Sequence, residues 1–133
     1  MKEQLNYGHS VSVEAGFNES VERVKSLLKD EGFGILCEID VTKTLKEKTG
    51  ADFRPYLILG ACNPELAHRA LVQENQLGLL LPCNVVVQSE NGRTTVSAID
   101  AGKMLGIVGN NDLVEIAREA DSRLRRVIER MGR

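Results

Sequence analysis

The chain has 133 residues, of which 42% are hydrophobic and 27% charged, and its 17 basic and 19 acidic residues give a net charge of -2. This length is typical of a single domain spanning residues 1–133, and the composition is that of an ordinary globular protein. The charge balance argues against a general nucleic-acid surface, which needs clustered Lys and Arg, and the lack of Trp beside two Tyr and three Phe argues against a platform for stacked bases.

The N-terminal part of the chain predicts a strand followed by a helix. Apolar and polar residues alternate over Leu5–Val13, which predicts a half-buried strand with His9 on its apolar side. We interpret His9 as a histidine that bonds a backbone carbonyl at the edge of the core. Asn18 is typical of a helix N-cap, and Gly32 predicts the end of that helix.

A second strand is predicted over residues 33–40, with Cys37 on its apolar face and therefore in the core. Glu38 and Asp40 fall on the other face, where a solvated surface is favoured over a cation site or acid–base chemistry. A short helix is predicted over residues 42–48. The basic residues near this helix predict ion pairs with the two acids, with an anion site as the alternative: Lys43, Lys46, Lys48 and Arg54.

The centre of the chain carries two strongly apolar runs. The run Tyr56–Ala61 predicts a strand buried on both faces. Asn63 and Pro64 then form a typical helix start, as N-cap and first helical residue. The second run, Leu79–Val87, predicts a strand with Pro82 at an edge or a bulge.

The C-terminal third predicts a hairpin and a long helix. Asn91 and Gly92 are typical of a two-residue hairpin turn that leads into a strand over residues 94–99. The glycine-spaced residues 100–111 predict a loop, and residues 112–131 predict a helix that packs on a sheet. Together these elements favour an α+β fold, a mostly antiparallel sheet with helices packed on one face.

Two short Cys-Asn phrases form the one constellation that resembles a site. We predict that Cys62, Asn63, Cys83 and Asn84 lie together and bind a ligand. Three interpretations of the thiols stay open. They pack as small hydrophobes, they form a redox dithiol, or they bind a soft metal such as zinc with His68 as third ligand.

The sequence predicts a cytoplasmic protein. The first residues have no apolar segment of the kind that a signal peptide contains, and no apolar run approaches the length of a membrane span. Three cysteines match no secreted disulfide framework, so we expect thiols that are reduced.

The chain resembles the uncharacterised bacterial and archaeal family called domain of unknown function 302. The resemblance rests on Tyr-Leu-Ile-Leu-Gly-Ala-Cys-Asn-Pro at 56–64 and Gly-Leu-Leu-Leu-Pro-Cys-Asn-Val at 78–85, supported by Glu-Gly-Phe-Gly at 31–34, Glu-Ile-Asp-Val at 38–41 and Ala-His-Arg-Ala-Leu at 67–71. It implies a fold similar to the TATA-binding-protein-like α+β class and a homodimer. It implies no activity.

Three classes of function follow from these observations. The first is a module that binds a small ligand or a metal near the Cys-Asn phrases, and it is the one that we favour. The second is an enzyme that uses Cys62 and Cys83 as redox thiols. The third is an interaction protein that works as a homodimer, without membrane or nucleic acid as a partner.

Overall fold

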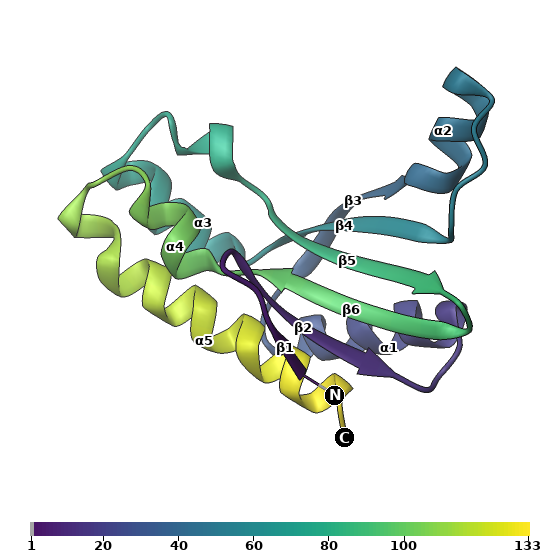
Figure 1. The fold of residues 1–133 in the computed structure, drawn as a ribbon. Coiled ribbons are helices and arrows are strands. Elements are labelled where there is room, and N and C mark those ends of the chain that lie inside the picture. The colour runs from purple at the N-terminus through teal and green to yellow at the C-terminus, as the bar shows by residue number, and fades with distance from the viewer. Residues whose placement is uncertain (1) are drawn as a thin grey trace.

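A computed structural model describes residues 2–133 of the chain, with side chains from Leu5 onward. Within these residues one sheet has the strand order β1-β2-β6-β5-β4-β3, and every neighbouring pair is antiparallel (Figure 1). The elements in chain order are β1 (Lys2–Gln4), β2 (Gly8–Val13), α1 (Phe17–Asp30), β3 (Gly34–Asp40), α2 (Val41–Thr49), β4 (Tyr56–Cys62), α3 (Pro64–Gln73), the 3-10 turn η1 (Leu77–Leu80), β5 (Cys83–Glu90), β6 (Arg93–Ile99), α4 (Ala101–Gly106), the 3-10 turn η2 (Asn111–Leu113) and α5 (Val114–Met131).

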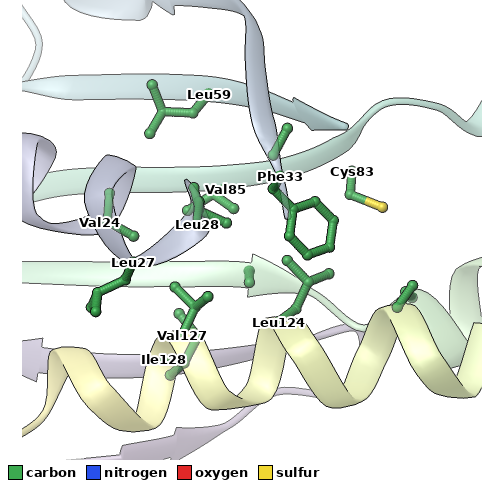
Figure 2. Packing of buried hydrophobic residues seen from close by; sticks show 14 of the residues in the cluster. Val24, Leu27, Leu28, Phe33, Leu59, Cys83, Val85, Leu124, Val127 and Ile128 are labelled. Carbon is green, nitrogen blue, oxygen red and sulfur yellow. The ribbon is translucent and has the colours of Figure 1, made fainter. Parts of the chain in front are cut away.

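The core lies between one face of the sheet and the helices α1 and α5, so the predicted α+β class is confirmed (Figures 1 and 2). Each helix buries one apolar stripe, as an amphipathic helix on a sheet does. Figure 2 shows Leu28 of α1 and Leu124 and Val127 of α5 among the side chains between the layers. Helix α2 is different, because it has no buried residue and projects from the sheet between the end of β3 and the start of β4 (Figure 1).

The hairpin of β5 and β6 and the start of α3 form as predicted. Asn91 and Gly92 take positive φ angles of 55° and 77°, which a two-residue turn of this kind requires. Asn63 caps α3, since its Oδ1 accepts a hydrogen bond from the backbone N–H of Leu66 at 3.1 Å, and Pro64 is the first helical residue.

The predictions for the N-terminal part need three corrections. The strand predicted from Leu5 is β2, which begins only at Gly8 and pairs with a separate β1. Gly16 rather than Asn18 is the N-cap of α1, without a side-chain hydrogen bond. His9 does lie on the helix side of the sheet, but it bonds the carboxylate of Asp121 in α5 rather than a backbone carbonyl.

The prediction that Cys37 lies in the core is wrong. Cys37 is exposed, because β3 is an edge strand and its register with β4 shifts between Ile35 and Cys37. Such a bulge puts an extra residue into one strand and interrupts the simple alternation of faces. The prediction that β4 is buried on both faces is also wrong, since its first three residues, including Ile58, are only half-buried.

Two segments near the site differ from the prediction. The strand predicted over Leu79–Val87 begins only at Cys83, so Pro82 precedes the strand instead of lying at an edge or a bulge of it, and Leu77–Leu80 form the turn η1. The segment 100–111 is not a plain loop, since Asp100 caps the short helix α4 by accepting a hydrogen bond from the N–H of Lys103 at 3.0 Å. The predicted C-terminal helix forms as α5, preceded by η2.

Candidate functional site

The two Cys-Asn phrases meet because of the way the chain connects β4 to β5. These strands are antiparallel neighbours, so the end of β4 lies beside the start of β5. The residues between them leave the sheet as α3 and η1 and return to the same place. Ala61 is the register partner of Cys83, and Cys62 follows Ala61 directly. The sequence repeat therefore marks one end of a strand pair.

Cys62 and Cys83 are free thiols in a poorly solvated environment. Cys62 is half-buried and Cys83 is buried. Burial raises the pKa of Cys62, and for Cys83 burial, together with the charges of Cys62 and Asp121, raises the pKa to about 11. Desolvation penalises a thiolate, so both groups are neutral thiols at neutral pH. A low-pKa nucleophile at the start of α3, as the redox interpretation of Cys62 requires, is not favoured.

Asn63 and Asn84 have different positions. Asn63 is only 9% exposed and faces the same region as the two thiols. Asn84 is exposed and, by the alternation of β5, lies on the opposite face from Cys83. The predicted set of four is therefore split, with three residues together and Asn84 on the outside of the sheet.

A cavity of about 290 Å³ lies where these three residues meet. It is bounded by the end of β4, the start of β5, α3 and α5, and its lining includes Leu36 and Leu71, which are 66% and 39% exposed. Figure 2 shows Cys83 and Phe33, two residues of its wall, above α5. The remaining wall is mostly aliphatic: Leu36, Ala61, Cys62, Asn63, Leu66, Ala67, Ala70, Leu71, Gly78, Leu81, Pro82, Leu105, Ile116 and Ala120.

His68 is not part of this wall. It is exposed on α3 and lines a separate surface hollow with Val72 and Glu115. The structure thus does not bring His68 to Cys62 and Cys83 as a third ligand. Binding of a soft metal such as zinc stays a prediction.

The sequence did not predict a polar cluster that His9 forms with Asp100 and Asp121. Nε2 of His9 lies 2.9 Å from Oδ1 of Asp121 and 3.9 Å from Oδ2 of Asp100, and both acids are buried. Asp121 also accepts hydrogen bonds from the backbone N–H of Ala101 at 3.1 Å and from Nε of Arg125 at 2.8 Å. Ligand atoms of the three residues lie within 4.8 Å of one another, a spacing compatible with a metal ion. Asp121 is a buried acid within the apolar stripe of α5, and this position in the pattern is the one sequence feature that could have indicated the cluster.

The prediction that the basic residues around α2 pair with Glu38 and Asp40 is wrong, because Lys46 and Arg54 have other partners. Lys46 contacts Asp52 at 2.9 Å, and Arg54 contacts Glu90 at 2.8 Å. Glu38 pairs with Lys25 of α1 at 2.8 Å, while Asp40 serves as the N-cap of α2. The alternative of an anion site stays a prediction.

Comparisons with known proteins agree on one family. A family model described as domain of unknown function DUF302 matches residues 9–131. The chain is also similar to a solved structure described as the crystal structure of an uncharacterized conserved protein DUF302 from Bacillus stearothermophilus. The identity is 38%, the match covers 96% of this chain and 99% of that chain, and the TM-score is 0.88. No curated protein matches the chain. Within the described residues, no helix is both long and apolar enough to cross a membrane.

Proposed function

The chain belongs to the DUF302 family, and we propose a function from the geometry of the site. The domain binds a small, mostly apolar molecule in the cavity between the end of β4 and the start of β5. The main support for this proposal is that one concave, largely aliphatic wall also contains the polar groups of Cys62, Asn63 and Cys83. Small-molecule sites combine an apolar lining with a few convergent polar groups in this manner, and the volume lies near the lower end of their usual range.

The chemistry of the thiols supports binding over a redox reaction. Neutral, partly or fully buried thiols act as small hydrophobic groups with weak hydrogen-bonding capacity. The raised pKa values of Cys62 and Cys83 lower the fraction of thiolate, which is the form that exchange with a disulfide needs. A redox enzyme that uses Cys62 and Cys83 is therefore the weaker candidate.

The binding proposal is tested by filling the cavity. Ala67 is a half-buried wall residue on α3, and Ala67→Leu adds apolar volume at that wall while leucine remains a good helix former. We expect the neutral fluorescent probe N-phenyl-1-naphthylamine to bind the wild type at one site, and Ala67→Leu to weaken this binding at least about tenfold. Fluorescence titration measures both.

Ala51→Leu is the matched control, because Ala51 is exposed and lies outside the cavity. It should bind the probe like the wild type. Failure of the wild type to bind, or equal binding by the two variants, would contradict the proposal.

We further propose that the chain forms a homodimer through β3 of each copy. β3 is an edge strand with six of its seven residues exposed, and it carries the apolar side chains of Leu36 and Ile39 at 66% and 46% exposure. An unpaired edge with exposed apolar side chains is a template for another strand. Antiparallel pairing of two β3 strands would be the self-complementary contact that a two-fold dimer needs.

A charge on this edge should prevent the dimer. We expect sedimentation equilibrium to show dimers for the wild type and monomers for Ile39→Lys, because an exposed lysine on an edge strand opposes strand addition. Ile107→Lys is the matched control, since Ile107 is 76% exposed but lies after α4, away from β3. A monomeric wild type, or the same dissociation in both variants, would refute the proposed interface.

A further inference from the structure

We propose that His9, Asp100 and Asp121 form a binding site for a divalent ion of a first-row transition metal such as Mn²⁺. The inference goes beyond the proposed function and does not depend on it, because none of the three residues lines the cavity. Imidazole nitrogen and carboxylate oxygen are usual protein ligands of such ions, and Mn²⁺ prefers carboxylate oxygens to thiols.

Three elements bring these side chains to one place. His9 in β2 is the register partner of Ala98 in β6, and β6 leads directly to Asp100 at the start of α4. The backbone N–H of Asp100 donates to the carbonyl oxygen of Tyr7 at 2.9 Å, which holds Asp100 beside β2. Asp121 reaches the same point from α5, since its Oδ1 contacts the ring of His9.

The distances fit one coordination sphere. Nε2 of His9 lies 2.9 Å from Oδ1 of Asp121 and 3.9 Å from Oδ2 of Asp100. Two ligand atoms at about 2.1 Å from one ion lie about 3 Å apart at a right angle and at most about 4.2 Å apart. Neutral imidazole carries its proton on either nitrogen, so Nε2 can offer its lone pair to an ion while Nδ1 holds the proton. The side chain of His9 is 13% exposed and those of both acids 11%, so an ion can enter from solvent.

Both carboxylates are oriented by hydrogen bonds from outside the site. Oδ1 of Asp100 accepts from the N–H of Lys103 at 3.0 Å, so Oδ2 is the oxygen that faces the imidazole. Asp121 accepts from the N–H of Ala101 at 3.1 Å and from Nε of Arg125 at 2.8 Å. Hydrogen bonds behind a ligating carboxylate fix its direction and strengthen metal binding.

The balance of charge also favours a cation. Asp100 and Asp121 are both 8% exposed. Arg125 pairs with Asp121, whereas among the described residues the one ion-pair contact of Asp100 is the 3.9 Å approach of His9. Lys103 is close in sequence, but its Nζ donates to a backbone carbonyl oxygen at 2.7 Å. A buried carboxylate without a cationic partner is costly, and a divalent ion would remove this cost.

Asp100→Asn tests a carboxylate ligand without removing a helix cap. Asparagine is an equally good N-cap, so α4 is retained while the charge is lost. Asp40→Asn is the matched control, because Asp40 caps α2 in the same way, by accepting the N–H of Lys43 at 3.0 Å. Mn²⁺ is the probe, since the loss of its solution EPR signal on binding measures the affinity.

His9→Gln tests the imidazole ligand. Glutamine retains a neutral N–H donor for Asp121, so the contact between β2 and α5 can persist, while its amide is a weaker ligand than imidazole. His68→Gln is the matched control, because the same change is made to the exposed histidine of α3.

We expect the wild type to bind one Mn²⁺ ion and to unfold at a higher temperature when the ion is present. Asp100→Asn and His9→Gln should each weaken binding at least about tenfold, whereas both controls should bind like the wild type. The inference is overturned if the wild type binds no Mn²⁺ at millimolar concentration, or if Asp100→Asn binds as tightly as Asp40→Asn. Equal binding by His9→Gln and His68→Gln also overturns it. Thermal unfolding without Mn²⁺ shows whether each variant is folded, and if His9→Gln is not, the Asp100→Asn comparison decides.

Discussion

Replacing Leu124 with alanine should lower the free energy of unfolding by about 2–5 kcal/mol, the usual cost of truncating a fully buried leucine. Leu124 is 0% exposed, and Figure 2 shows its side chain extending from α5 toward Phe33 between the helix and the sheet. The change removes apolar contacts and leaves a void that a close-packed core fills only in part. Denaturant or thermal unfolding measures the loss.

The same experiment separates a core helix from an interface helix. Leu79→Ala is the matched control, because Leu79 is 83% exposed and its truncation should alter stability little. Sedimentation of Leu124→Ala should give the same oligomeric state as the wild type, since Leu124 packs within its own chain. A stable variant with an altered oligomeric state would contradict the role of α5 described above.

The stability of the protein should fall at alkaline pH because of Cys83. Its folded pKa is raised to about 11 from a usual value of 9.0, so the folded state holds this proton more tightly than the unfolded state. The stabilising contribution is therefore fully present below pH 9 and is lost as the pH rises through 11. Two pH units correspond to about 3 kcal/mol, and chemical unfolding at a series of pH values measures the decline.

Cys83→Ala is the control for this decline, because it lacks the titrating thiol and keeps the other alkaline groups. Its stability is lower throughout, but the fall between pH 9 and 11 should be shallower than in the wild type.

Alkylation with iodoacetamide at neutral pH gives a second readout. The exposed Cys37 should react first, and Cys83 at least about tenfold more slowly than a free thiol. An equal slope in both proteins, or rapid alkylation of Cys83, would be incompatible with its buried, neutral state.

Much of the candidate site could be predicted from local sequence. The cap and first residue of α3, Asn63 and Pro64, follow from rules that depend on a few neighbouring residues, and both are confirmed. The turn at Asn91 and Gly92 is of the same kind. The apolar stripe of α5 correctly predicted a helix that packs on the sheet, because a period of about 3.6 residues is visible without the fold.

The positions of individual site residues could not be predicted in this way. His68 follows Cys62 closely in sequence, but α3 turns it to the outside, away from both thiols. Asn84 was grouped with Asn63 because the two phrases look alike, although one asparagine belongs to a helix cap and the other to an exposed strand face. The same two-residue motif therefore has different surroundings when one copy precedes a helix and the other lies in a strand.

The sequence alone predicted most of the segments that form helices and strands, the apolar stripes of the long helices, and that two Cys-Asn phrases bracket one helix. Only the tertiary structure decided that β3 is an edge strand with Cys37 exposed, that Asp121 of α5 meets His9 of β2, and that the ends of β4 and β5 enclose a cavity. The physical reason is the range of the interactions. Caps, turns and periodicity act between residues a few positions apart, whereas strand order, burial and cavities arise from contacts between segments far apart in the chain.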